Sequence, residues 1–455
     1  MMRSSYYCLS LVLLLGMLTF VVSGRAEKSP EASVKHEQFL TPQESFAHGD
    51  FEQTLALIES GAQDPFPAFL HRLKWLSLVR LGKTSEGFKA FEQYSARLGR
   101  EEELLLRELA MNSILPFRTD MREQVRGAAY TALKEIESDD VVPYLEEGLT
   151  DGTGMVRALI AEGLGNLDLG QQSKQLHALV DDQAGFVRAT VLKGLGKSGN
   201  KKFVPVLKRF LDDEQPLVQV AAAGGLILLG HDEYWNRITS ATQASEGYER
   251  GTALRMLGML EDPRALPLLQ QGLLDPQPSI RAAAVSSLGK LGLPESTDLL
   301  LAMLSDRIPA VQSVAAMSLG MLRAERAVPA LTRALHNANP GVRAAAAAGL
   351  LEMSSPYGVV ADTIQALMGE KNPGLRSAAA KVLAKGLKRD VMGPLILLAQ
   401  DPVPKPRISA FRSIGRLGGR DVIPILKRGI QDGNEAVRAT AAGAIARVLS
   451  HSSGT

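Results

Sequence analysis

Residues 156–165 read VRALIAEGLG, and residues 187–196 repeat this wording as VRATVLKGLG. The spacing between Arg157 and Arg188 recurs in both directions along the chain, and only the step from Arg343 to Arg376 is slightly longer. Eleven positions at this spacing hold an arginine or a glutamine. This column consists of Arg126, Arg157, Arg188, Gln219, Arg250, Arg281, Gln312, Arg343, Arg376, Arg407 and Arg438. Chance does not produce such a register, so the chain is a repeat protein.

Each copy has the pattern of two helices joined by a turn. Val156, Ile160 and Leu164 recur every four residues, which places them on one face of a first helix. Gly165, like the equivalent glycine of several other copies, fits a left-handed cap at the end of that helix. A proline such as Pro205 then stands where a second helix begins. Proline is tolerated there because an N–H group in the first turn of a helix has no hydrogen-bond partner within the helix.

A third column holds an acidic residue. Aspartate stands six residues before the arginine in most copies, and Ala244, Asn337 and Glu370 replace it in three. Such an aspartate can accept hydrogen bonds from the next helix's free N–H groups, and it can pair with an arginine of its own copy or of a neighbouring copy. The positions that we expect to form a structural ladder include Asp151, Arg157, Asp182, Arg188, Asp275, Arg281, Asp432 and Arg438.

From about Arg122 to Leu449 these columns and the Val-Arg-x-Ala-Ala…Leu-Gly wording resemble HEAT repeats. The unit is shorter than the roughly 40–47 residues of typical HEAT repeats, and it resembles the HEAT-like repeats of bacterial proteins that are named after phycobilisome lyases. The resemblance implies an all-α protein, a right-handed α-solenoid of about eleven helix pairs over residues 118–455. It also implies that the second helices line the concave side.

The N-terminus predicts export. Residues 1–26 combine Arg3, an apolar run from Leu9 to Val22 and small residues before a cleavage point, as in a secretory signal peptide. The run is short for a membrane span of roughly 20 residues, so an uncleaved membrane anchor is the lesser alternative. Cleavage after Ala26 leaves 49 basic and 49 acidic residues and removes the one cysteine, Cys8. A neutral, cysteine-free exported chain favours the bacterial periplasm and disfavours nucleic-acid binding.

Residues 27–40 are polar and predict a linker, and residues 41–117 predict a separate helical region. Its expected helices, Gln43–Glu59, Phe66–Leu81 and Ser85–Leu98, have a spacing that resembles tetratricopeptide-like hairpins. This region could cap the open end of the array or carry its own binding groove. At the other end, the last copy has a single helix to Leu449, which suits a modest cap or end-to-end self-association.

The sequence offers no catalytic constellation. Gly194 to Gly199 fits G-x-G-x-x-G, but no strand precedes it, as a phosphate-binding loop requires. The seven histidines lack metal-ligand spacing. HEAT-like di-iron hydroxylases carry several His-Glu dipeptides, and this chain has one, His36-Glu37. We therefore predict no catalytic residue, cofactor or metal ligand, and a protein that is not an enzyme. The alternative is an enzyme or enzyme subunit of the lyase-like or metal-dependent HEAT-repeat kind.

The fourth copy departs most from the pattern, and its second helix holds the array's one tryptophan. Tryptophan, tyrosine and arginine are common interface anchors, although this tryptophan could simply fill a gap in the core. The predicted partner-binding residues are Tyr234, Trp235, Arg237, Lys208 and Arg209. Charges of both signs on the second helices suit a protein partner better than a polyanion. The sequence thus predicts an exported scaffold that holds protein partners on its concave face.

Overall fold

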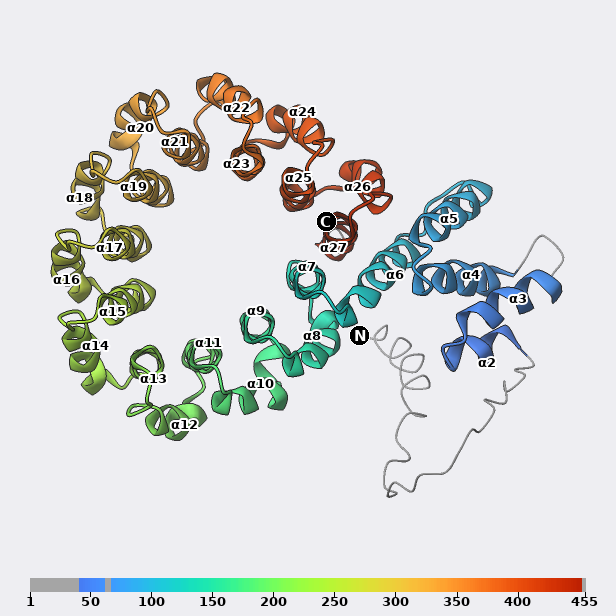
Figure 1. Ribbon diagram of the computed structural model, residues 1–455, viewed down its shortest axis with the longest axis horizontal. Coiled ribbons are helices and arrows are strands. Elements are labelled where there is room, and N and C mark those ends of the chain that lie inside the picture. The colour runs from blue at the N-terminus through green and yellow to red at the C-terminus, as the bar shows by residue number, and fades with distance from the viewer. Residues whose placement is uncertain (1–40, 62–66, 452–455) are drawn as a thin grey trace, which may run out of the picture. The chain divides into compact units, whose positions relative to one another are not determined.

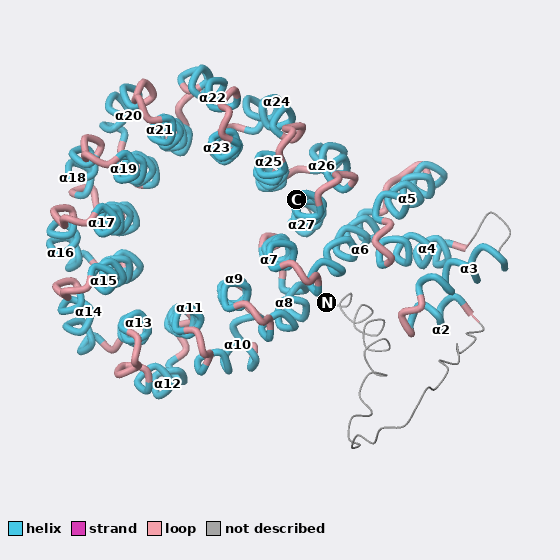
Figure 2. Tube along the Cα trace, in the orientation of Figure 1, coloured by secondary structure: helices cyan, strands magenta, loops and turns pink. Residues whose placement is uncertain are grey.

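The computed structural model describes residues 41–61 and 67–451, which belong to one compact unit, Thr41–Thr455. The predicted signal peptide, residues 1–26, and the predicted linker, residues 27–40, lie outside the described residues. The described part consists of helices α2 to α27, short 3-10 helices and loops, without a strand (Figure 2). Among its helices, none has the length and apolar character of a membrane span. The all-α prediction is confirmed.

Five helices precede the repeats: α2 (Pro42–Ala47), α3 (Phe51–Gly61), α4 (Ala68–Arg80), α5 (Thr84–Leu98) and α6 (Glu103–Ile114). Helix α6 continues into the 3-10 helix η1 (Leu115–Thr119). The single helix predicted over Gln43–Glu59 is two helices, because the chain turns at Gly49, whose φ is 82°. The pair α4 and α5 encloses Trp75, Phe88 and Phe91, all fully buried.

The eleven copies are confirmed as helical units. Their first helices are α7 (Glu123–Lys134), α9 (Gly154–Gly165), α11 (Gly185–Lys197), α13 (Pro216–Leu228), α15 (Gly247–Leu260), α17 (Pro278–Leu291), α19 (Pro309–Met321), α21 (Pro340–Glu352), α23 (Pro373–Leu383), α25 (Pro404–Leu417) and α27 (Glu435–His451). Their second helices are α8 (Val142–Glu147), α10 (Lys174–Ala178), α12 (Val204–Arg209), α14 (Trp235–Ala241), α16 (Leu266–Gly272), α18 (Ser296–Met303), α20 (Val328–Ala334), α22 (Ala361–Met368), α24 (Lys388–Leu398) and α26 (Ile423–Ile430). The eleventh copy has no second helix among the described residues.

The glycine that follows the apolar column does not form a left-handed cap. Gly165 and Gly196 lie within their first helices and have no positive φ. The glycine serves helix packing, because a Cβ added to Gly196 would lie 2.4 Å from the Cα of Gly225 in the next first helix. Gly320 and Gly349 meet in the same way, at 2.5 Å. Small residues therefore allow consecutive first helices to approach closely.

This close approach decides which helices lie inside the curve. Consecutive first helices pack tightly on one another, whereas consecutive second helices barely touch. The array therefore bends toward its first helices, and Figure 1 shows α7, α9, α11 and their successors on the inner side, with α8, α10, α12 and their successors outside. The expectation that second helices line the concave side is wrong for this chain.

The array closes on itself. Helix α27 packs against both α6 and α7, so that the first and last repeats meet (Figure 1). A Cβ added to Gly443 in α27 would lie 2.9 Å from the Cβ of Ala132 in α7. Helix α6 lies beside α27 on the outer side, in the place that second helices occupy in the other copies; no second helix follows α27 within the described residues. The repeats thus form a ring, and the two ends cap each other within one chain.

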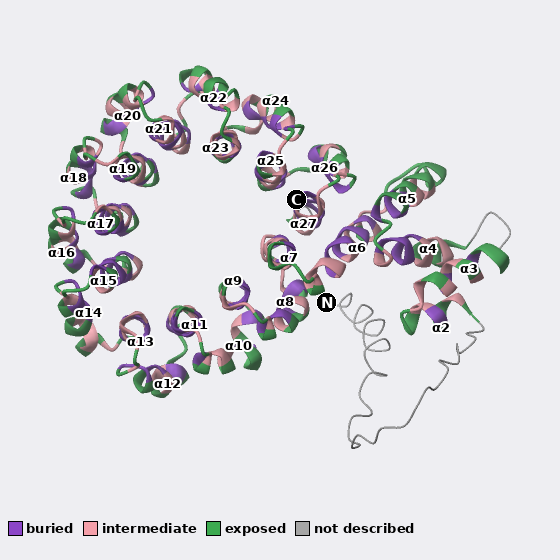
Figure 3. Ribbon diagram, viewed as in Figure 1, coloured by how far each residue is buried: buried purple, intermediate pink, exposed green. Residues whose placement is uncertain are grey.

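One continuous core runs around this ring. A single cluster of buried apolar side chains extends from Trp75 in α4 to Leu449 in α27, and Figure 3 shows buried residues on inner and outer helices alike. The boundary predicted at residues 117 and 118 therefore falls inside one compact unit. Helix α6 of the N-terminal region is a structural part of the ring, because it completes the last repeat, and Figure 1 shows α2 to α5 projecting outward from it.

Candidate functional site

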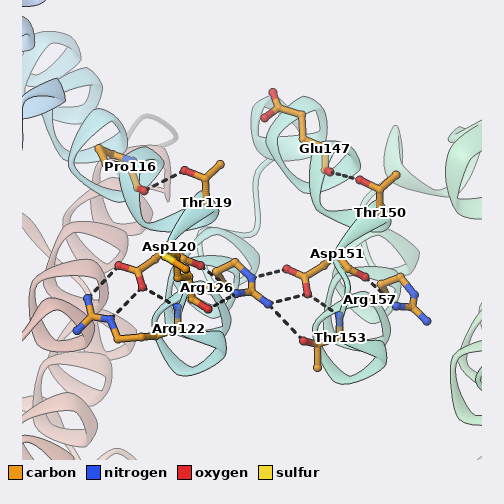
Figure 4. Close-up of polar contacts among 11 residues, drawn as sticks. Pro116, Thr119, Asp120, Arg122, Arg126, Glu147, Thr150, Asp151, Thr153 and Arg157 are labelled. Atoms are coloured by element: carbon orange, nitrogen blue, oxygen red, sulfur yellow. Dashed lines mark hydrogen bonds and ion pairs between the residues drawn. The ribbon is translucent and has the colours of Figure 1, made fainter.

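The ladder joins each unit to the next one along the chain. Arg157 donates from Nε to Asp182 Oδ2 over 2.7 Å and from Nη2 to Asp182 Oδ1 over 2.8 Å. Its Nη1 donates to the backbone carbonyl of Asp151 over 2.7 Å. The same arrangement at Arg126, between the carbonyl of Asp120 and the carboxylate of Asp151, is drawn in Figure 4. Such two-pronged, charge-assisted bonds fix orientation as well as distance.

Of the two pairings that the sequence left open, the structure has the one between neighbours. The bidentate or near-bidentate rungs are Arg126–Asp151, Arg157–Asp182, Arg188–Asp213, Arg250–Asp275, Arg281–Asp306, Arg376–Asp401 and Arg407–Asp432. Each aspartate also accepts from a backbone N–H two residues on, as Asp151 does from Thr153 over 2.8 Å. The hydrogen bonds from Arg281 hold the pKa of Asp306 below its ordinary value, against the opposing effect of burial.

The ladder ends where the ring closes. Arg438, the last arginine of the column, donates to the carbonyl of Asp432 over 2.9 Å and lies 5.5 Å from the centre of the Phe117 ring. Asp120, the first aspartate, pairs with Arg122 of its own unit at 2.9 Å. The closing contact is therefore built differently from the ionic rungs within the array.

We call the contact of α27 with α6 and α7 the seam. Arg107 of α6 donates to Ser450 Oγ over 2.9 Å. Arg447 of α27 pairs with Glu137 at 2.7 Å. Arg412 of α25 reaches across to Glu135 at 2.7 Å. The apolar contact of α27 with its two neighbours is thus surrounded by polar bonds.

Sequence reasoning missed that ladder positions change in pairs. Asn337 Nδ2 donates to Gln312 Oε1 over 3.1 Å, so a neutral pair replaces the ionic one. Gln219 donates to the carbonyl of Asp213 over 2.6 Å, and Ala244 offers no acceptor opposite it. The signal was available, because Ala244 and Asn337 each follow a glutamine of the arginine column by the spacing of one rung. Two hollows of about 490 and 510 Å³ flank Ala244, where the rung is missing.

The predicted partner-binding residues come together on the outer side of the ring, not on its concave side. Lys208 and Arg209 belong to α12, Trp235 and Arg237 belong to α14, and Tyr234 directly precedes α14. Both elements are second helices, which Figure 1 shows outside the first helices. Their predicted role in binding stays a prediction, but its place on the concave face is wrong.

Most of these side chains have contacts within the chain. The guanidinium of Arg264 lies 4.2 Å from the centre of the Trp235 ring, and Asp232 pairs with Arg264 at 2.6 Å. Arg237 donates to the carbonyl of Leu211 over 2.8 Å. Arg209 pairs with Asp181 at 2.5 Å. These contacts give Trp235 and the two arginines a structural role that needs no partner.

The inner face of the ring carries the charge that the sequence appeared to lack. At 100° per residue, the positions five and nine residues after the ladder column point away from the second helices, into the ring. We call these positions the inner wall. They hold nine basic residues and three acidic ones. The basic residues are Lys193, Lys197, Arg255, Lys290, Lys381, Lys385, Arg412, Arg416 and Arg447, and the acidic ones are Glu135, Glu162 and Glu352.

Positive charge is therefore gathered on the inner wall. The inner wall has a formal charge of +6 and the whole chain one of +2, so the remainder of the chain has −4. Near the seam the wall's arginines are neutralised by Glu135 and Glu137. On α11 and α17, by contrast, Lys193, Lys197 and Lys290 have no ion pair within the described part of the chain.

A hollow of the inner wall lies over α9, α11, α13, α15 and α17, and we call it the inner groove. It has a volume of about 590 Å³. Lys193, Lys197, Arg255 and Lys290 line it together with aliphatic and methionine side chains. Burial, and then the positive charges of Lys197 and Arg255, lower the pKa of Lys193. The groove is thus both apolar and positively charged.

No group of three or more His, Cys, Asp or Glu side chains with the arrangement of a metal site occurs in residues 41–61 and 67–451. The ionic residues of the ladder are saturated by one another, as in Arg157 with Asp182.

Comparison with known proteins identifies the repeat. A family model described as HEAT repeats matches residues 112–191, 236–308, 299–384 and 392–453, which together make up well over half of the chain. No curated protein matches the chain. The family match covers both the first and the second helices of the repeats, and it begins inside α6.

Among solved structures, human deoxyhypusine hydroxylase is 20% identical over 56% of this chain and 98% of its own, with a TM-score of 0.27. The CpcE–CpcF complex of phycocyanin lyase from Nostoc sp. is 21% identical over 53% of this chain and 91% of its own, with a TM-score of 0.30. A Kap121p mutant is 13% identical over 88% of this chain and 54% of its own, with a TM-score of 0.36. Values this low say nothing of a shared activity.

Proposed function

We propose, from the premise that this chain belongs to the HEAT-repeat family, that it is a non-enzymatic exported scaffold that holds a protein partner against the inner wall of its ring. The observation that carries this proposal is the gathering of basic residues on the inner wall, where those away from the seam, such as Lys193, Lys197 and Lys290, have no ion pair within the described residues. The ladder, the glycine contacts and the apolar columns already account for the packing of the units. Residues of one charge that gather on a surface, outside the contacts that pack the units, are better explained by binding than by folding.

The geometry of a ring suits a scaffold. Eleven first helices present one continuous curved surface, so a partner can contact several units at once. Binding then rests on shape and charge complementarity across many helices, which is how repeat arrays use their concave surfaces. Met317 and Met321 on α19 are 45% and 54% exposed, which is more than burial in the core would leave. The export part of the proposal rests on the signal-peptide pattern of residues 1–26.

The proposal is tested by site-specific photo-crosslinking in the envelope fraction. A photoreactive amino acid replaces Met317 on the inner wall, and in a second variant it replaces Leu397 on α24, which is 63% exposed on the outer side. We expect the same protein to be captured repeatedly through position 317 and not through position 397. Capture through position 397 alone, or through neither position, would overturn an inner-wall scaffold.

The non-enzymatic part has its own test. Metal analysis of the purified mature protein should find no stoichiometric iron or zinc. A full equivalent of either metal, held through dialysis against a weak chelator, would replace this proposal by the metal-dependent alternative.

A further inference from the structure

The inner groove brings four basic residues to one hollow, and none of the four has an ion pair within the described residues. Lys193 and Lys197 stand one turn apart on α11, and Arg255 and Lys290 face the same hollow from α15 and α17. Glu162, the one acidic residue of the lining, is already paired with Lys134 at 2.5 Å. Four cations in one hollow repel one another unless an anion enters. Burial, and then this repulsion, lowers the pKa of Lys193.

The groove also presents apolar side chains to solvent. Met155 of α9 is 65% exposed at its edge, and Leu159, Leu217 and Met259 contribute to the lining. Methionine adapts its shape to different apolar partners, because its side chain is unbranched and polarisable. A ligand that satisfies the groove therefore needs negative charge and aliphatic side chains within the same short segment.

A polypeptide meets this requirement better than a nucleic acid does. Proteins that hold single-stranded nucleic acid usually stack its bases on aromatic rings, and the lining of the groove contains no aromatic residue. The groove spans five first helices but is only about 590 Å³ in volume, which accommodates a few side chains of a segment and not a wide duplex.

We propose that the inner groove binds an acidic polypeptide segment that also carries apolar side chains, with Lys193, Lys197, Arg255 and Lys290 pairing with its carboxylates. This inference rests on the proposed function, since it names the class of partner that the inner wall would hold. The apolar residues of the segment lie against Met155, Leu159 and Met259. Charge complementarity steers the segment into the ring, and the apolar contacts retain it.

The test uses defined fluorescent peptides and the mature full chain. One peptide alternates pairs of glutamate with leucine, a second replaces leucine by serine, and a third replaces glutamate by lysine. Fluorescence anisotropy should show that the Glu/Leu peptide binds, that the Glu/Ser peptide binds more weakly, and that the Lys/Leu peptide does not bind. Raising the salt from about 50 to about 500 mM should weaken the Glu/Leu complex, because exposed charge pairs are screened.

The decisive variant is Lys193→Glu with Lys197→Glu. Its matched control is Lys174→Glu with Lys201→Glu, which makes the same charge change at exposed residues outside the ring. We expect the groove variant to weaken Glu/Leu binding by about tenfold or more, as two attractive pairs become repulsive. The control should bind as the unaltered chain does. A milder variant, Arg255→Gln with Lys290→Gln, should weaken binding without any new charge, and circular dichroism establishes that each variant is folded.

Equal binding by the groove variant and the outer control would overturn the inference. So would tighter binding of a single-stranded oligonucleotide than of the Glu/Leu peptide, because the ligand would then be a polyanion of another class. If the peptides fail but a protein is still captured through position 317, the groove inference fails and the scaffold proposal stands. If both fail, the scaffold proposal fails with it.

Discussion

Asn337 Nδ2 donates a 3.1 Å hydrogen bond to Gln312 Oε1, at the junction where other units join an arginine to an aspartate. The junction therefore keeps a rung while both charges are gone. A buried arginine without its aspartate, or the reverse, leaves an uncompensated charge, which is far more costly than replacing both groups. The two positions are coupled for this reason.

Replacing the two residues one at a time should expose this coupling. Asn337→Asp alone places a carboxylate opposite a neutral glutamine, and Gln312→Arg alone places a guanidinium opposite an amide, so each single variant should unfold at lower urea concentration. The double variant should recover most of the loss, because it rebuilds the ionic rung seen at Arg281 and Asp306. We expect a coupling free energy of about 1–3 kcal/mol, which is typical of residues in direct contact. Strict additivity of the two single effects would contradict this account.

Breaking an ionic rung should cost more than neutralising it. Arg157 and Asp182 are both almost fully buried, with side chains 7% and 4% exposed. Arg157→Gln leaves the carboxylate of Asp182 unpaired and should lower the free energy of unfolding by roughly 3–5 kcal/mol. Adding Asp182→Asn, which copies the pair of Gln312 and Asn337, should restore part of it. Equal stability of the single and double variants, measured by urea unfolding, would argue against the ladder as a cohesive element.

The ladder also predicts how stability depends on pH. Hydrogen bonds from Arg281 and Arg376 hold the pKa values of Asp306 and Asp401 below their ordinary value, against burial. A carboxyl whose pKa is lowered by folding adds stability above its unfolded pKa of about 4 and loses it as the pH falls through the lower folded pKa. The melting temperature should therefore fall as the pH is lowered from about 5 to about 2. The neutral pair Arg281→Gln with Asp306→Asn should make that fall shallower, and an unchanged slope would exclude Asp306 as a contributor.

The seam can be forced open at one residue. A Cβ at Gly443 would already lie 2.9 Å from both the Cβ and the carbonyl oxygen of Ala132, so Gly443→Leu cannot be accommodated while α27 stays against α7. Small-angle scattering should show a larger radius of gyration for this variant, with helix content retained. Gly127→Leu is the matched control, because nothing lies within 4 Å of a Cβ added there. If Gly443→Leu leaves the radius unchanged, the seam tolerates more volume than the close contact with Ala132 indicates.

The repeat columns predicted the helices well because their spacing reflects packing within one unit. Val156, Ile160 and Leu164 must face the second helix whatever the array does at larger scale, and all three are buried. The number of units followed from the ladder column for the same reason. The direction of curvature and the closure of the ring could not be predicted from the repeat columns. Both depend on small differences between first-helix and second-helix contacts, which accumulate around the ring.

Two hints of the ring were nevertheless present in the sequence. In the other copies the ladder aspartate follows the second helix of the preceding unit. Asp120 belongs to the same column, so it indicates a helix of that kind ahead of the first copy. The last copy has one helix, near Leu449, and no second helix follows it within the described residues. The helix in excess at one end, α6, fits the gap at the other. The sequence does not predict the inner wall, because the resemblance to HEAT repeats implies concave second helices, whereas Lys193 and Lys197 belong to a first helix.

A final prediction separates the outer residues from the inner wall. Trp235 is half-buried, packs against the core and lies under the guanidinium of Arg264, 4.2 Å from its ring centre. Arg264→Ala removes this cation–π contact and should lower the free energy of unfolding by about 0.5–1 kcal/mol, and Trp235→Ala should lower it further, through lost packing. Neither change should affect capture through the crosslinker at position 317, since Trp235 belongs to the outer helix α14 and position 317 to the inner helix α19. Loss of capture in Trp235→Ala, at unchanged urea midpoint, would instead place the partner on the outer surface and make Trp235 its anchor.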